Sequence, residues 1–458
     1  MIKYSRALVT ILLAVIAFGA KAQSTTTPAT SSPYSRYGLG EYAPALLPQN
    51  IAMGGIGTAI NSVSGYNNIN VINPASYGMI NYTTIDAGIY ATIDNLNQNN
   101  GTGGTTSVTN ANFRLSHVAF AMPVNRHSAL SFGLLPYSEL GYNYKITQNN
   151  FGTSPTPSNP NTPKVDTNAV NYLYNGEGGL SKAYIGYGYH IGKHLLIGGN
   201  VSYIFGNLAE STETEIPTLY GTLDSKVQQT NSVGGFNYDY GIQYSFDFAD
   251  VNGNTNKHLV FGYSTSTGSS LNSTSSYVVS QYTYDSSGNQ NLAADSLVNN
   301  TGTKSKIKLP RINRFGVSFQ NDGHFLIGAD YTVGNWSSLT IDGTNAGLQN
   351  SKTLNVGGSI TPNINALRNY WARVDYRFGF IYEDTYLNVN NTDIKKQAVT
   401  FGFGLPLPNS LSTFDKINLS AEVGREGTLN NGLVKENYVN IHIGFTLNDK
   451  WFQRFKFQ

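Results

Sequence analysis

The sequence predicts an all-β protein, a transmembrane antiparallel β-barrel of about fourteen strands with an N-terminal hatch inside the lumen. Three observations predict this fold. Apolar and polar residues alternate in segments after position 84, the connections between these segments alternate between long and short, and the N-terminus has the pattern of a secretory signal. Composition agrees, because only 12% of the residues are charged while Gly (48) and Tyr (31) are abundant.

The first 22 residues are predicted to be a signal peptide. They begin with basic residues, continue with an apolar run over 7–20, and end in Ala20-Lys21-Ala22, the A-x-A pattern of a cleavage site. The apolar run is shorter than the roughly 20 residues that a membrane-spanning helix needs. Cleavage near Ala22 changes the formal net charge from +2 to −1, so we expect no nucleic-acid partner.

Strand periodicity is clearest in the middle and at the end of the chain. Over 182–191, Ala, Ile, Tyr, Tyr and Ile occupy one face, and Lys, Tyr, Gly, Gly and His occupy the other. Over 439–447 an apolar face of Val, Ile, Ile, Phe and Leu opposes a polar one. A period of two residues predicts strands with one apolar face toward lipid and one polar or small face toward the lumen.

Fourteen segments share this pattern, and most have the roughly 9–11 residues that a tilted strand needs to cross a bilayer. They span residues 84–93, 111–123, 128–148, 168–192, 194–208, 226–248, 258–284, 304–320, 324–336, 352–361, 370–388, 395–405, 416–425 and 436–447.

The connections between these segments predict which ends face outward. Residues 94–110 and 149–167 are long and polar, whereas 124–127 and 192–193 are short. Outer-membrane barrels have this asymmetry, with short periplasmic turns and long external loops. In hydrocarbon, each unpaired backbone group costs roughly several kcal/mol. An open sheet edge is therefore excluded, and the strands are expected to close into a barrel.

Aromatic residues near segment ends are predicted to form girdles at the membrane interfaces. They are Tyr142, Tyr144, Tyr282, Tyr284, Trp336, Tyr370, Trp371 and Trp451.

The stretch before the first strand is predicted to fill the barrel. Residues 50–77 are rich in Gly and Asn and lack alternation. A barrel of about fourteen strands has a lumen wide enough to leak, so something must occupy it. The predicted hatch and gate residues are Met53, Gly54, Gly55, Gly57, Asn73, Pro74 and Ala75. The predicted division is 1–22 signal peptide, 23–83 leader and hatch, 84–448 barrel and 449–458 periplasmic tail.

Several short motifs resemble the FadL-type long-chain fatty acid transporters of bacterial outer membranes, in the form common among Bacteroidetes. The resemblance covers essentially the whole mature chain. The motifs are residues 35–40 (SRYGLG), 52–57 (AMGGIG), 73–77 (NPASY), 176–181 (GEGGLS) and 308–316 (KLPRINRFG). The resemblance implies an N-terminal hatch within a fourteen-stranded barrel, and a kink in the third strand that opens the wall sideways.

Pro136 in the third segment is the candidate for that kink. Proline has no N–H to donate to the ladder, and Gly176, Gly178 and Gly179 in the fourth segment favour a bulge or bend. Two explanations are open at this point. The two segments either frame a lateral opening in the wall or both mark the boundary of an external loop.

Five charged residues are predicted to face the lumen: Arg114, Arg314, Arg373, Asp375 and Arg377. The last three follow from alternation in residues 370–380 (YWARVDYRFGF), since a charge on the lipid face near mid-bilayer costs roughly 2–4 kcal/mol. Such cations either hold a carboxylate head group or pair with acids of the wall or hatch.

No catalytic or metal motif stands out, and the sequence predicts neither an enzyme nor a cofactor. Residues 250–254 begin like a calcium loop, but Thr255 and Phe261 occupy the positions that need Gly and Glu. The chain has no cysteine, which excludes disulfides and thiol chemistry.

The leading functional hypothesis is passive transport of small hydrophobic molecules, fatty-acid-like by the resemblance, across the outer membrane of a Gram-negative cell. The expected partners are that ligand and outer-membrane lipid. The alternative is a structural or accessory barrel that serves protein secretion or surface attachment through a protein partner that the sequence does not identify. A general hydrophilic porin is a third possibility, and a packed hatch argues against it.

Overall fold

The computed structural model describes most of the chain after residue 30. The described ranges are 31–62, 68–99, 104–151, 168–216, 222–249, 255–285, 290–291, 295–407 and 415–449. The predicted signal peptide, the calcium-like turn at 250–254 and the tail from residue 450 lie outside these ranges.

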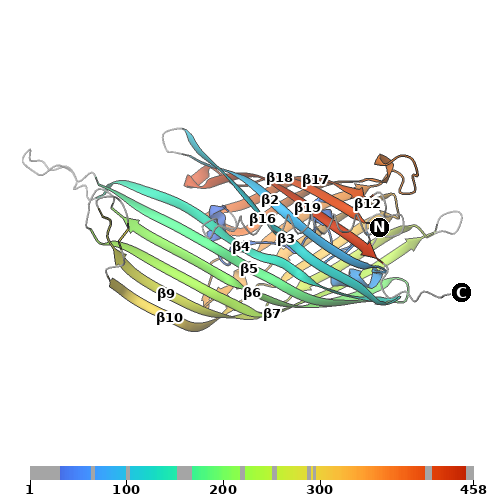
Figure 1. The fold of residues 1–458 in the computed structure, drawn as a ribbon, viewed down its shortest axis with the longest axis horizontal. Coiled ribbons are helices and arrows are strands. Elements are labelled where there is room, and N and C mark those ends of the chain that lie inside the picture. The colour runs from blue at the N-terminus through green and yellow to red at the C-terminus, as the bar shows by residue number, and fades with distance from the viewer. Residues whose placement is uncertain are drawn as a thin grey trace, which may run out of the picture.

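A single antiparallel sheet closes on itself to form the barrel (Figure 1). In chain order the long strands are β2 (Thr83–Asn99), β3 (Thr105–Asn125), β4 (Ser128–Phe151), β5 (Asn168–Ile191), β6 (Leu195–Glu215), β7 (Asp224–Phe248), β8 (Lys257–Ser266), β9 (Ser270–Tyr282), β10 (Asp295–Lys308), β11 (Ile312–Asn321), β12 (Phe325–Gly334), β15 (Ser351–Ile360), β16 (Asp375–Val389), β17 (Thr392–Pro406), β18 (Lys416–Gly427) and β19 (Val434–Asp449). The last strand, β19, pairs with the first, β2, along the full length of both.

The described strands occupy fourteen positions around the barrel, because two positions each hold two strands in line. Strands β8 and β9 both pair with β7. Strand β8 pairs with residues 239–248 of β7, and β9 pairs with residues 224–234. Strands β10 and β11 continue one another across Leu309, Pro310 and Arg311, and they pair with β9 and β8. Proline explains the second break, because it cannot donate to the ladder. The predicted fourteen-stranded antiparallel barrel is confirmed.

Side chains alternate across the wall as the sequence pattern predicts. On β7, Phe236, Tyr240 and Phe246 are exposed on the outer face, whereas Asn237 and Gln243 are buried on the inner face. The same division continues around the barrel. It follows from the bilayer, which favours apolar surface outside and leaves polar groups to the lumen.

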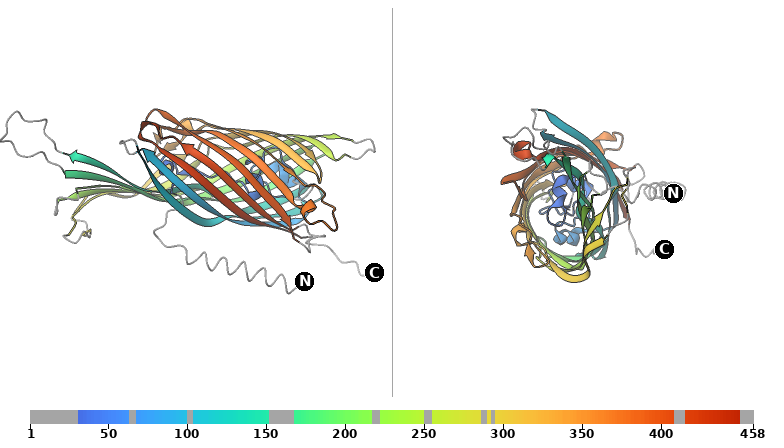
Figure 2. Two further views of the ribbon diagram at one scale, coloured as in Figure 1. Left: turned by 90° about the horizontal axis from the view of Figure 1, so that it is seen from above. Right: turned by 90° about the vertical axis from the view of Figure 1, so that its left-hand side faces the viewer.

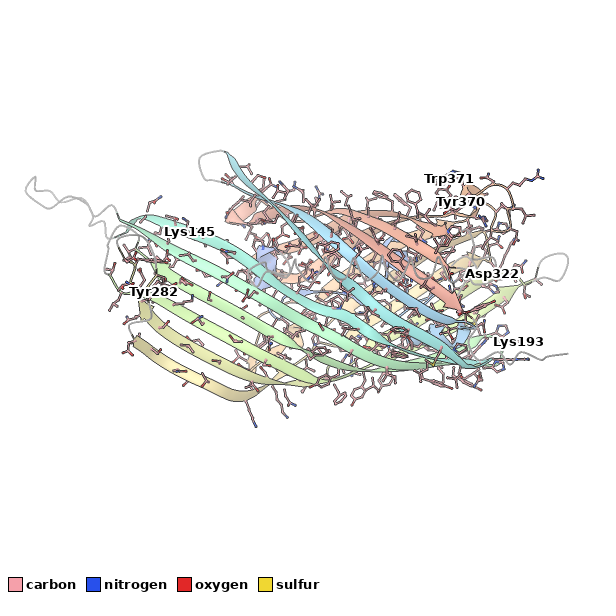
Figure 3. The ribbon with its side chains drawn as sticks, viewed as in Figure 1. Lys145, Lys193, Tyr282, Asp322, Tyr370 and Trp371 are labelled. Atoms are coloured by element: carbon pink, nitrogen blue, oxygen red, sulfur yellow. The ribbon has the colours of Figure 1, made fainter. Side chains whose placement is uncertain are left out.

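The wall is taller on one side (Figure 1). Strands β4 and β5 each have 24 residues and β7 has 25, more than twice the roughly 9–11 needed to cross a bilayer. Strands β8, β11, β12 and β15 have ten residues each, which matches one crossing. The surplus length extends the wall at the end that carries Lys145 and Tyr282 (Figure 3).

Short elements lie in the lumen and between strands. Those inside the barrel are η1 (Pro33–Arg36), β1 (Glu41–Tyr42), α2 (Pro48–Ile51) and η2 (Pro74–Met79). Those in connections are η3 (Trp336–Ser338), β13 (Thr340–Ile341), β14 (Thr344–Asn345), η4 (Trp371–Arg373) and η5 (Asn430–Gly432). No helix among the described residues combines the length and the apolar character that crossing a membrane requires.

Two sequence predictions about side-chain direction are wrong. Tyr142, Tyr282 and Trp336 are almost fully buried on the inner side instead of lying in an interfacial girdle. Arg373 does not face the lumen from a strand, because residues 371–373 form η4 and β16 begins only at Asp375. A short helical turn interrupts the period-two pattern, so alternation fails for residues 373 and 374, and Val374 is fully buried.

A buried ion cluster lies at the start of β16. The Asp375 carboxylate accepts hydrogen bonds from Arg377 Nη2 at 2.8 Å, Lys416 Nζ at 2.7 Å and Thr361 Oγ1 at 2.7 Å. Arg377 also donates to Asn418 Oδ1 at 2.7 Å. Asp375 and Arg377 therefore face inward as predicted from alternation, and the cluster joins β16 and β18 through charge-assisted bonds.

Replacing Asp375 tests this cluster. The Asp375→Asn variant removes the buried anion that Arg377 and Lys416 share, so we expect a loss of about 3–5 kcal/mol in the free energy of unfolding. Urea-induced unfolding of the purified barrel, followed by its heat-modifiable gel mobility, measures this loss. The control is Asp384→Asn, which breaks the exposed pair with Lys395 and should leave the midpoint unchanged. Equal midpoints for both variants would contradict the assignment.

Candidate functional site

The candidate site is the lumen, which residues 33–62 and 68–80 occupy. We call these residues the luminal segment. Seen along the barrel, the segment lies inside the ring of strands (Figure 2, right). Its apolar side chains, among them Leu47, Met53, Ile56 and Ile69, are fully or almost fully buried.

Part of the luminal segment packs directly against the backbone of the wall. Gly54 has φ +70° and Gly55 has φ +80°, a left-handed conformation that favours glycine. A Cβ on Gly379 of β16 would overlap the amide nitrogen of Gly54, and one on Gly357 of β15 would overlap the carbonyl oxygen of Met53. Glycine on both sides is therefore what permits this close approach.

Inward side chains of the wall satisfy the backbone of the luminal segment. The N–H groups of Gly57 and Thr58 both donate to Asp330 Oδ2 of β12 at 2.7 Å. The Gly54 N–H donates to Thr400 Oγ1 of β17 at 2.8 Å. These bonds matter because a buried backbone group without a partner is costly.

Residues 73–75 anchor the end of the luminal segment on a different part of the wall, at β5 and β6. Asn73 Oδ1 accepts from the N–H of Ala75 at 3.1 Å and so caps η2. Asn73 Nδ2 donates to the Thr58 carbonyl oxygen at 2.7 Å. The carbonyl group of Pro74 lies against Gly188 of β5 and Gly198 of β6, where a Cβ would collide with it.

The wall is interrupted between β3 and β4. These strands pair only from Val118 to Asn125 and from Ser128 to Leu134. Beyond that point β3 remains paired with β2, and β4 remains paired with β5, but the described residues of β3 and β4 share no further ladder pair. We call this unpaired stretch the wall opening.

The luminal segment covers the β4 side of the wall opening. Its short strand β1 pairs with β4, with Glu41 opposite Glu139 and Tyr42 opposite Ser138. The Ala43 N–H donates to the Tyr137 carbonyl oxygen at 3.0 Å. Backbone groups that β3 leaves unpaired thus find partners in the lumen.

A cluster of side chains spans the wall opening itself. The Arg114 guanidinium of β3 forms an ion pair with the Glu139 carboxylate of β4. The Tyr90 hydroxyl of β2 donates to Glu139 at 2.9 Å, and the Arg114 guanidinium carbon lies 4.5 Å from the centre of the Tyr90 ring. Arg114 therefore faces an acid of the wall in this structure.

Pro136 and the predicted glycines lie next to the wall opening, on the β4–β5 side. The β4–β5 register shifts between Pro136 and Ser138, which leaves Tyr137 as an extra residue. Gly178 has φ +123°, and a Cβ on Gly176 would overlap the Tyr142 ring. The β4–β5 pairing resumes beyond the shift, so the wall opening lies along the other edge of β4.

A cavity of about 270 Å³ lies between the luminal segment and the wall. Ser116 of β3 and Leu135 and Pro136 of β4 line it, so it reaches both sides of the wall opening. The lining also includes more acids than bases. The acids are Glu41, Asp94, Glu139, Asp330, Glu383, Glu422, Glu426 and Glu436, and the bases are Arg114, Arg314 and Lys396.

Sequence reasoning missed most of these carboxyl groups. Glu383 is on β16, and Glu422 and Glu436 are on β18 and β19, each at an inward position of its alternating segment. Alternation alone could have placed them in the lumen. Their gathering with Glu41 depends on the path of the luminal segment, which alternation does not predict.

The remaining inward-facing predicted charges lie in two separate places. Arg314 of β11 lines the cavity and donates from Nη2 to the Tyr42 hydroxyl at 3.0 Å. Asp375 and Arg377 belong to the buried cluster described above and do not line the cavity. Among the described residues no three His, Cys, Asp or Glu side chains are arranged to hold a metal ion.

Adding a methyl group at Gly379 tests the packing of the luminal segment on the wall. The Gly379→Ala variant forces Gly54 away from β16, so we expect a loss of about 1–3 kcal/mol in stability and faster proteolysis within residues 47–62. The control is Gly199→Ala, whose Cβ has ordinary contacts of 3.4 Å or more. Digestion of both purified variants with a broad protease measures the difference. Identical cleavage patterns would contradict close packing at this point.

Several solved structures share the fold of this barrel. The CymD monoaromatic hydrocarbon channel is 12% identical with a TM-score of 0.50, over 91% of this chain and 100% of that one. A Pseudomonas aeruginosa FadL homologue is 12% identical with a TM-score of 0.51, over 90% and 99% of the two chains. The P. putida toluene transporter TodX is 14% identical with a TM-score of 0.52, over 88% and 98%. At such identities the likeness shows a shared fold.

Comparison of the sequence gives the family. No curated protein matches the sequence. The family model described as BamG matches residues 1–458, which is the whole chain. The chain belongs to the BamG family.

Proposed function

We propose that this protein is a passive outer-membrane channel for small hydrophobic molecules. The observation that carries the proposal is the cavity that touches both strands at the wall opening. A ligand in such a cavity has a path sideways through the wall to the apolar outer face. The shared fold with channels named for monoaromatic hydrocarbons and toluene supports this reading.

The luminal segment serves as the gate in this proposal. Strand β1 covers the edge of β4 at the wall opening, so a ligand leaves only when β1 moves. Met53, Gly54, Gly55 and Gly57 anchor the middle of the segment on the wall, and Asn73-Pro74-Ala75 anchors its end. We therefore place the moving part in residues 35–44 and the fixed part in residues 47–62 and 68–80.

The charge of the cavity bears on the ligand class. A fatty-acid carboxylate would enter a lining with eight carboxyl groups and three cations, and burying its charge without a free cation as partner is costly. A neutral hydrophobic molecule avoids this cost. Within the hydrophobic class we therefore favour neutral compounds over the fatty-acid anions that the sequence motifs suggest.

Uptake measurements test the transport proposal. Cells or liposomes that contain the protein should take up a neutral aromatic hydrocarbon such as toluene faster than matched samples without it. We expect a smaller increase, or none, for oleate at neutral pH. Radiolabelled substrates measure both rates. Equal toluene uptake with and without the protein would exclude the channel function.

An engineered disulfide tests the gate. Glu41 and Glu139 are directly opposite in an antiparallel pair, a separation that suits a disulfide, and the chain has no other cysteine. Oxidised Glu41→Cys/Glu139→Cys protein should lose uptake to the level of samples without protein, because β1 is fixed on β4. Reduction of the same sample should restore it and serves as the matched control. Equal uptake in both redox states would show that β1 need not leave β4.

A second candidate is the structural or accessory barrel. The dense anchoring of residues 47–62 and 68–80 on the wall, together with the polar lining of the cavity, favours it. Purification from the native membrane under mild conditions distinguishes the two functions. A stoichiometric protein partner, combined with no hydrocarbon uptake, would support the accessory role.

A further inference from the structure

The outer face of the barrel carries a row of unpaired basic side chains beside β11. Strand β11 has ten residues, enough for one crossing of the bilayer, so Arg311 and the end of β10 lie at the edge of the hydrocarbon layer. This edge faces the end with the tall wall. Strand β10 begins there, with Asp295 opposite Gln281 and next to Tyr282 of β9, and it ends at Lys308. The 308–316 motif therefore lies at the level of the lipid headgroups.

Alternation places the lysines of β10 on the outside. Ile307 is fully buried on the inner face, so Lys304, Lys306 and Lys308 point outward, and all three are exposed. Arg311 is exposed as well. None of these four side chains forms an ion pair with another residue in the described part of the chain.

One acid that contacts β10 is Asp342, in the turn between β13 and β14. Its N–H donates to the Lys306 carbonyl oxygen at 3.2 Å, and its carboxylate accepts a hydrogen bond from the Ser305 hydroxyl. The row thus keeps a strong positive excess. Three lysines spaced two residues apart repel one another, so an external anion that binds among them would relieve this repulsion.

A shallow groove lies next to the lysines on the same outer face. Its lining comes from three adjacent strands and combines aromatic rings with small and polar residues. The lining residues are Tyr203 of β6, Gly234, Gly235, Phe236 and Tyr238 of β7, Ser269, and Ser270 and Asn272 of β9.

The register brings the groove and the lysines together. Lys306 lies directly opposite Asn272, and Lys308 lies directly opposite Ser270. Neighbouring strands are roughly 4.8 Å apart, so a lysine side chain easily reaches across one strand. The groove therefore has aromatic rings on one side and ammonium groups on the other.

We propose that this outer face binds a phosphate-bearing lipid of the outer leaflet. Lys304, Lys306 and Lys308 bind the headgroup phosphates, and the rings of Tyr203 and Phe236 contact the adjoining apolar part of the lipid. Basic residues at the headgroup level attract anionic lipids, and aromatic rings favour the same depth. This site is independent of the lumen and of the proposed transport.

A lipid-binding measurement on the full-length protein tests the site. The protein is purified in zwitterionic detergent and titrated with bis-phosphorylated lipid A, and native mass spectrometry counts the bound molecules. The Lys306→Ser/Lys308→Ser variant should bind roughly 20- to 30-fold more weakly, since each lysine near a membrane surface contributes about 1 kcal/mol. The matched control is Lys145→Ser/Lys435→Ser, which removes two lysines outside the row and should bind as the unaltered protein does.

Two further binding measurements define the ligand. Dephosphorylated lipid A should bind as weakly as lipid A binds to the Lys306→Ser/Lys308→Ser variant, and inorganic phosphate alone should not compete at equal concentration. Heat-modifiable gel mobility shows that both variants are folded. Equal lipid A affinity for the two variants, or equal binding of lipid A with and without phosphate, would overturn the proposal.

Discussion

The structure depends on one constraint, that backbone N–H and C=O groups in a membrane must find partners within the protein. Closure of β19 on β2 meets this constraint around most of the wall. Between β3 and β4 the ladder stops, and there the constraint is met from inside, because β1 and Ala43 pair with β4. The luminal segment is therefore part of the wall at this point, which links any motion of the segment to the state of the wall opening.

The same constraint explains the composition of the inner face. A segment without regular structure has many free backbone groups, and in the lumen these bind inward side chains such as Asp330, Thr400 and Asn355. Glycine at 357 and 379 then permits the two backbones to touch. The polar and small inner face therefore reflects the needs of the luminal segment as much as those of a solvent-filled pore.

Much of the barrel could be predicted from the sequence, because the bilayer imposes one period on every strand. The same reasoning was wrong at residues 371–374, where a helical turn interrupts the alternation, and at Tyr142, Tyr282 and Trp336, which are buried on the inner side. Alternation identifies a face but not what lies against it. For this reason the cavity acids on β16, β18 and β19 could be placed in the lumen from sequence, whereas their proximity to Glu41 could not.

The carboxyl groups of the cavity constrain function more than the fold does. A fold shared at 12–14% identity accommodates different ligands, and the lining decides among them. Arg114 is held by Glu139 and Arg314 by Tyr42, so two of the three cations are engaged with the protein itself. The third, Lys396, lies within 3.4 Å of Glu41 on the luminal segment. While β1 stays on β4, each of these three cations is engaged with the protein, so an anionic ligand finds no free partner among them and a neutral molecule needs none.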